Sequence, residues 1–153
     1  MIIDATDLVV GRLCSFVAKK ALLGEKIDII NCENAVVSGS RANVLEKFKH
    51  KRERTTVVRG PFISRMPDRL VRRMIRGMLP YKKEKGEKAF DRVMCYVGVP
   101  SEFNGKKFET LDSANLNKRD LVRFVTIQEI CKEMGAKSQF WQSQNGPISQ
   151  GAK

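Results

Sequence analysis

The amino-acid sequence predicts an α/β fold in which helices pack on a largely parallel sheet. Short apolar runs alternate with amphipathic segments along the chain, which is the pattern of strand–helix–strand units. The 153 residues are 42% hydrophobic, enough for one domain with a proper core. We therefore expect a single domain over residues 1–138, with a basic projecting segment at residues 41–92. Residues 139–153 are expected to form a tail that orders only with partners.

The first part of the chain supplies most of the expected sheet. An apolar run at residues 1–5 predicts a buried strand. Apolar residues at helical spacing predict a helix over residues 10–23, closed by Gly24 as a C-cap. Residues 27–32 predict a second strand, and residues 35–37 a short third one.

A polar helix is expected over residues 41–54, after a turn at residues 38–40. Val44, Leu45 and Phe48 can anchor its first turns on the core. Its last six residues, KHKRER, offer nothing apolar to bury. We therefore expect this end of the helix to project from the body of the protein.

The most informative stretch is residues 59–80. Pro67 suits the first position of a helix that runs to about Leu79. Its apolar residues recur on one side of the helical period, and they are Leu70, Val71, Met74, Ile75, Met78 and Leu79. Its arginines fall on the other side, and they are Arg69, Arg72, Arg73 and Arg76. A charged face is often only solvated, but Asp68 is the single acid here, which favours a face whose guanidinium groups hold phosphate oxygens.

The remaining third is less regular. We expect a basic loop at residues 81–88, a helical turn at residues 89–92 and a fourth strand at residues 93–98. Residues 101–118 are rich in turn formers and predict a loop. Thr126 with Glu129 forms the pattern of a capping box, which predicts a helix that ends at Gly135.

The positive charge of the chain is concentrated in its middle. The net charge is +12, and residues 41–92 hold 17 Lys and Arg against 6 Asp and Glu, whereas the rest holds 12 against 11. One very basic region on a nearly neutral body is typical of a polyanion binder. Aromatic residues make up only 7% of the chain, which favours folded RNA over single strands stacked on aromatic side chains.

Several other classes of protein are disfavoured. The four cysteines are far apart and His50 is the only histidine, so no metal site is expected and the thiols are expected to be reduced and buried. No apolar run approaches the ~20 residues of a membrane span, and the amino terminus lacks the basic start of an export signal. The turn at residues 38–40 could cradle a nucleotide phosphate, but it lacks the Lys and second Gly of a P-loop, so a plain N-cap turn is favoured. His50 lies between two lysines, and no catalytic group or cofactor is predicted.

Four stretches of residues 1–100 form a multi-point pattern. They are Ile3, Asp4, Ala5 with Gly11, Arg12, Leu13; residues 31–39 (NCENAVVSG); Arg59, Gly60, Pro61 with Arg65 and Pro67; and residues 75–80 (IRGMLP) with Gly86 and residues 93–98. This pattern resembles the L-thirteen family of large-subunit ribosomal proteins in its archaeal and eukaryotic form. The resemblance implies a three-layer α/β/α domain with a four-stranded, mainly parallel sheet. It also implies binding to large-subunit ribosomal RNA (rRNA), a part in subunit assembly and no catalytic activity.

The expected function is that of a cytoplasmic structural protein of the large ribosomal subunit, in contact with rRNA and neighbouring ribosomal proteins but with no membrane or small-molecule substrate. The alternative is a free-standing regulator that binds RNA or DNA. Thirteen basic residues are the candidates for rRNA binding: Arg12, Lys49, Lys51, Arg52, Arg54, Arg59, Arg65, Arg69, Arg72, Arg73, Arg76, Lys82 and Lys83.

Overall fold

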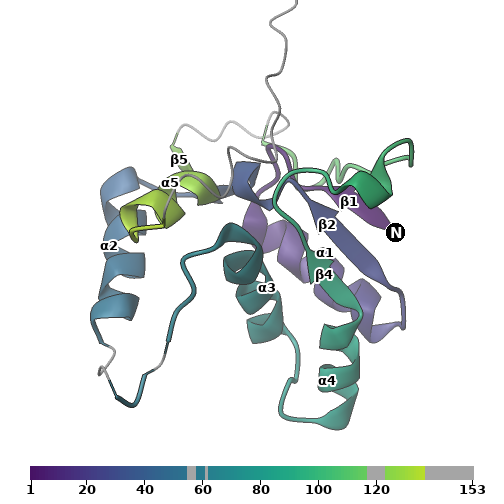
Figure 1. Cartoon of the computed structure of the whole chain (residues 1–153), viewed down its shortest axis with the longest axis horizontal. Coiled ribbons are helices and arrows are strands. Elements are labelled where there is room, and N and C mark those ends of the chain that lie inside the picture. The colour runs from purple at the N-terminus through teal and green to yellow at the C-terminus, as the bar shows by residue number, and fades with distance from the viewer. Residues whose placement is uncertain (55–57, 61, 117–122, 137–153) are drawn as a thin grey trace, which may run out of the picture.

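A three-stranded parallel sheet forms the centre of the protein. The structure, a computed structural model, describes residues 1–54, 58–60, 62–116 and 123–136. The strands β1 (Ile2–Asp4), β2 (Ile27–Ile30) and β4 (Val93–Cys95) lie in the order β1-β2-β4, and all three are parallel (Figure 1). Their register places Ile3 beside Ile29 and Ile29 beside Cys95. These three side chains make one apolar row on the face that the helices cover.

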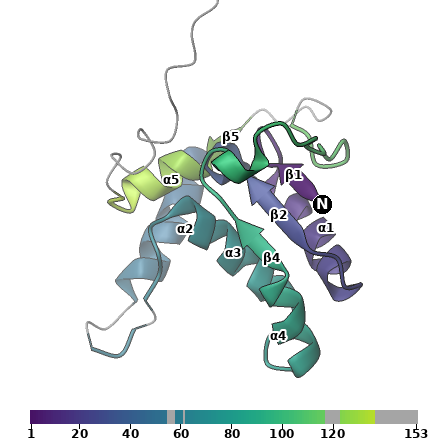
Figure 2. The same ribbon diagram turned by 45° about the vertical axis from the view of Figure 1, so that its right-hand side comes forward.

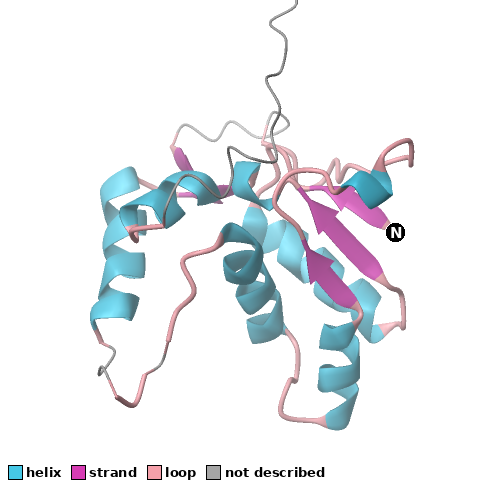
Figure 3. Cartoon of the chain, viewed as in Figure 1, coloured by secondary structure: helices cyan, strands magenta, loops and turns pink. Residues whose placement is uncertain are grey.

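Three helices pack beside this sheet and close the core. They are α1 (Val10–Leu22), α3 (Pro67–Met78) and α4 (Glu84–Asp91), labelled in Figure 1; Figure 3 shows helices in cyan and strands in magenta from the same view. Each helix is amphipathic and turns its apolar stripe inward. The buried residues of these helices include Leu13, Val17, Ala21, Leu70, Val71, Ile75 and Ala89. The α/β class predicted from the sequence is therefore confirmed.

The prediction of a four-stranded sheet is wrong for the main sheet. After the short 3-10 turn η1 (Cys32–Asn34), strand β3 (Val36–Ser38) pairs with β5 (Phe124–Thr126) in a separate antiparallel sheet of two strands. Among the described residues, an isolated bridge from Val9 to Val36 connects β3 to the chain that follows β1. The three-layer arrangement that the resemblance implied is not confirmed.

Helices α2 (Arg41–Glu53) and α5 (Ile127–Glu133) lie together at the side of the molecule away from the main sheet (Figures 1 and 2). Two residues of α2, Val44 and Phe48, are buried, and every residue after Phe48 is exposed. The Thr126 side chain accepts a hydrogen bond from the Glu129 N–H at 3.2 Å, so the predicted cap of α5 is present. Gly135 follows the helix with a φ of 81°, as expected of a C-terminal glycine.

Helix α4 begins inside the segment that the sequence predicted to be a loop. Glu84 and Glu87 stand in its first turn, where acids favour a helix, and Glu84 pairs with Lys88 one turn later. Gly86 is required here, because a Cβ at this position would lie 2.2 Å from the carbonyl oxygen of Pro80. The connection between α3 and α4 is therefore tightly packed against α4 itself.

Residues 101–116 form a loop apart from the 3-10 turn η2 (Ser101–Phe103), in line with the prediction. Residues 117 and 118 and the tail at residues 139–153 lie outside the described residues.

The core contains four free thiols and one buried carboxyl group. Burial raises the pKa of Cys14 and of Cys131 to about 12, and a hydrogen bond with Cys95 together with burial raises the pKa of Cys32. The Glu33 carboxylate accepts the Gly98 N–H through both oxygens at 3.1 Å, while burial raises its pKa. Thiols held in the protonated form are poor nucleophiles. These groups therefore support the fold and offer no reactive centre.

Candidate nucleic-acid interface

Helix α3 presents arginines from a firmly packed base. Pro67 occupies its first turn, and the Leu70, Val71 and Ile75 side chains are at most 4% exposed in the core against α1. Met74 is half-buried and Met78 is 45% exposed, so the predicted apolar stripe is narrower than the sequence suggested. Such a helix cannot rotate without exposing its core face. The positions of its arginines are therefore fixed.

The sequence predicted that all four arginines of α3 face solvent, but the structure exposes only one of them. Only Arg69 is exposed, whereas the other three are half-buried. The Arg72 guanidinium lies over the Phe90 ring at 4.5 Å, and that of Arg76 lies over Tyr81 at 5.1 Å. These cation–π contacts order the two guanidinium groups without neutralising their charge.

The chain before α3 is fastened to the same face. An Nη1 group of Arg73 donates a hydrogen bond to the Phe62 carbonyl at 3.0 Å. Together with the four arginines of α3, Phe62, Ser64 and Phe90 line a surface hollow of about 200 Å³. Neither phenylalanine was assigned a role from the sequence. Their position on either side of the arginine helix in the sequence was the only signal available.

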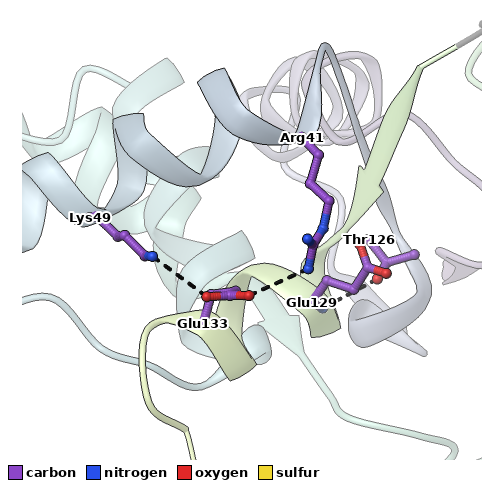
Figure 4. Close-up of polar contacts among 5 residues, drawn as sticks. All are labelled: Arg41, Lys49, Thr126, Glu129 and Glu133. Atoms are coloured by element: carbon purple, nitrogen blue, oxygen red, sulfur yellow. Dashed lines mark hydrogen bonds and ion pairs between the residues drawn. The ribbon is translucent and has the colours of Figure 1, made fainter.

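The cations of α2 are held differently, mostly by the end of α5. Lys49 and Arg41 form ion pairs with the two carboxylate oxygens of Glu133, at 3.6 and 3.4 Å (Figure 4). Arg52 donates to the Met134 carbonyl at 2.6 Å. These groups already have partners of opposite charge or helix-end carbonyls. The α2 face is therefore less positive than its sequence implies.

The other residues predicted to bind rRNA lie on several different segments of the chain. Arg65 donates to the Gly135 carbonyl at 3.1 Å, beside the Arg52 contact. Lys51 lies over the Phe48 ring at 5.4 Å. Arg12, on α1, is exposed, and its contact with the Ser113 carbonyl is long, at 3.5 Å. The remaining four are exposed and have no described side-chain partner: Arg54, Arg59, Lys82 and Lys83.

Other kinds of site find little support in the described residues. The described ranges bring no three His, Cys, Asp or Glu side chains together in a way that could hold a metal ion. Ser40 occupies the N-cap of α2 without a side-chain capping bond, and Gly39 has a φ of 135°. His50 is exposed on α2. Within the same ranges, none of the helices has both the length and the apolar character to cross a membrane.

The fold and the site define a basic α/β protein whose arginine helix is braced by aromatic rings. Comparison with known families makes this more specific. The family model described as "Ribosomal protein L13" matches residues 1–102, which is two thirds of the chain. The chain belongs to this family, which confirms the resemblance drawn from the sequence. The family is a structural component of the ribosome, and the protein is therefore not an enzyme.

Individual relatives support the same family, and they come from archaea. The chain is 42% identical over 137 residues to the large ribosomal subunit protein uL13 of Methanosarcina barkeri, and 40% identical over 136 residues to that of Methanococcoides burtonii. It is also 40% identical over 140 residues to the protein of the same name from Methanocaldococcus jannaschii. Each alignment covers 89% of this chain and 98% of the relative. The protein is thus of the archaeal type and spans nearly the whole length of these relatives.

Proposed function

We propose that the protein is a structural constituent of the large ribosomal subunit, located in the cytoplasm, that binds folded large-subunit rRNA and supports subunit assembly. Its partners are rRNA and neighbouring proteins of the subunit. The family and the names of the relatives support the ribosomal role. The observation that carries the rRNA contact is the row of ordered arginines on α3, because planar guanidinium groups bind phosphate oxygens in pairs.

The thirteen basic residues predicted from the sequence divide into three groups under this proposal. The α3 arginines together with Arg54, Arg59, Lys82 and Lys83 are expected to make the main phosphate contacts, because none of them pairs with an acid in the described part of the chain. Arg12 and Lys51 are expected to add peripheral contacts. Lys49, Arg52 and Arg65 are expected to orient α5 as well as to meet RNA, because they already contact its last turn.

Sedimentation of the tagged protein in a cell lysate tests the ribosomal role. We expect the protein to comigrate with the large subunit on a sucrose gradient and to remain there after a wash in moderate salt. A protein found mainly in the free fractions contradicts the proposal and favours the free-standing RNA- or DNA-binding regulator.

A binding titration tests the rRNA contact itself. We expect the purified protein to bind deproteinised large-subunit rRNA with an affinity that falls steeply with salt, because each phosphate contact releases counterions. An affinity that does not depend on salt contradicts a phosphate-based interface.

A further inference from the structure

The hollow beside α3 has a lining that phosphate binding alone does not explain. Phosphate groups need cations and N–H donors, which the four arginines supply. The hollow also has two phenylalanine rings, from a loop before α3 and from α4. The Phe62 side chain is 73% exposed, although burial of a phenylalanine ring is worth ~1.5 to 3 kcal/mol. An exposed aromatic ring that stands among arginines is therefore a candidate for contact with a flat, electron-rich partner.

The backbone holds Phe62 in this position. Its carbonyl accepts the Arg73 hydrogen bond at 3.0 Å, which ties the loop to α3. Gly60 has a φ of 71°, and a Cβ there would lie 3.0 Å from the Phe62 nitrogen and 3.2 Å from its ring. A glycine at this position allows the turn that places the ring over the hollow.

Arg72 supplies an unused donor at the same place. Its guanidinium plane covers the Phe90 ring, and its Nε atom is buried without a hydrogen-bond partner among the described residues. Buried donors in folded proteins nearly always have a partner. Arg72 therefore keeps a donor that no group in the described part of the chain uses.

We propose that this hollow binds a single unpaired nucleobase of the rRNA, stacked on Phe62 with its acceptor edge toward the arginines. Arg69 and Arg76, which both line the hollow and lie seven residues apart on α3, hold the phosphates on either side of that nucleotide. A volume of about 200 Å³ is below the range of typical small-molecule pockets and suits one ring system rather than a helix. Extruded bases are commonly recognised by stacking on aromatic rings and by hydrogen bonds to their edges. This inference rests on the rRNA-binding function proposed above.

Substitution of Phe62 tests the stacking. The probe is deproteinised large-subunit rRNA, and the dissociation constant is measured at several salt concentrations. Stacking of one base is commonly worth a factor of ~5 to 150 in affinity, so we expect Phe62→Ala and Phe62→Leu to weaken binding by that factor with an unchanged salt slope. Phe62→Trp keeps a flat ring and should bind like the parent. Phe108→Ala removes another exposed ring, on a different loop, and should also bind like the parent.

Chemical probing of the bound rRNA identifies the occupant. We expect base-specific reagents, dimethyl sulfate for adenine, cytosine and guanine and a carbodiimide for uracil, to reveal one base that the parent protein protects and Phe62→Leu does not. The backbone protections from hydroxyl radicals should stay the same in both. The inference is overturned if Phe62→Leu binds as tightly as the parent, because the ring would then act only as an apolar surface. It is also overturned if no base changes its reactivity. If the unsubstituted protein does not bind the rRNA at all, the proposed function itself is refuted.

Discussion

Helices α2 and α3 both carry a dense set of cations, yet the structure uses these cations in different ways. Helix α3 is anchored along its length by Leu70, Val71 and Ile75, and the guanidinium groups of Arg72 and Arg76 rest on aromatic rings. Helix α2 is anchored only by its first turns, and Lys49 and Arg52 contact the end of α5. An aromatic ring orders a cation and leaves its charge in place, whereas a carboxylate orders the cation and also neutralises its charge. The charge count of a helix thus says less about its binding than the groups that order the charges.

The largest expected effect concerns the anchor of α3. Ile75→Ala should lower the free energy of unfolding by ~2 to 5 kcal/mol, because Ile75 is fully buried and its loss leaves a cavity. Met78→Ala is the matched control on the same helix, and it should stay within about 0.5 kcal/mol since that side chain is 45% exposed. Urea unfolding measures both. Equal losses from the two variants would mean that α3 is not anchored on one face.

Two glycines, Gly77 in the last turn of α3 and Gly86 in the first turn of α4, should respond in opposite directions to substitution by alanine. Gly86→Ala should destabilise the protein by about 1 to 3 kcal/mol, because the new Cβ collides with the Pro80 carbonyl. Gly77→Ala meets no atom within 4 Å and should stabilise the protein by about 0.5 to 1 kcal/mol through helix propensity. Thermal unfolding of the two variants checks the signs. A stabilising Gly86→Ala would contradict the tight connection between α3 and α4.

The salt dependence of rRNA binding compares the two helices directly. The double variant Arg69→Gln with Arg76→Gln should flatten the slope of log affinity against log salt by about two units, one for each phosphate contact. The double variant Lys49→Gln with Arg52→Gln should flatten it by less than about one unit, because α5 already holds both cations. Filter binding of deproteinised rRNA gives both slopes. A larger change from the α2 pair would reverse the assignment of the main phosphate contacts to α3.

The smallest expected effect comes from the acid that holds the α2 cations. Glu133→Gln should change stability by less than about 1 kcal/mol, because Arg41 and Lys49 form exposed ion pairs with it. The same change frees two cations and should strengthen rRNA binding modestly. Glu129→Gln is the control on α5, since the described residues show no ion pair at Glu129. An unchanged affinity in Glu133→Gln would mean that these cations do not face RNA.

The sequence predicted the elements that have long periodic patterns and missed those that do not. Helices α1 and α3 follow from apolar residues at helical spacing, and β1 and β2 from continuous apolar runs. Strand β5 has three residues and an exposed Phe124, so nothing local marks it as a strand or as the partner of β3. The first part of helix α4 was not predicted, because its mixed basic and acidic residues are a composition typical of a loop. Its helical packing, which buries Gly86 and Ala89, is visible only in the structure.

The candidate site was predicted in composition but not in geometry. The clustering of arginines on α3 is visible in the sequence, since residues three and four apart share a helix face. The partners that hold these arginines come from elsewhere in the chain: Phe62 precedes the helix, and Tyr81 and Phe90 follow it. Tertiary contacts of this kind have no local signal. The same is true of Glu133, which lies 84 positions after Lys49.

The four buried thiols make the susceptibility of this protein to oxidants depend on its conformation. In the folded chain each sulfur is shielded from reagents, and Cys14 and Cys131 are held in the unreactive thiol form at neutral pH. Opening of the core exposes the four thiols together and lets the pKa values of Cys14 and Cys131 return toward their ordinary value. Newly made chains that fail to fold are therefore open to oxidation and cross-linking, while folded chains are protected.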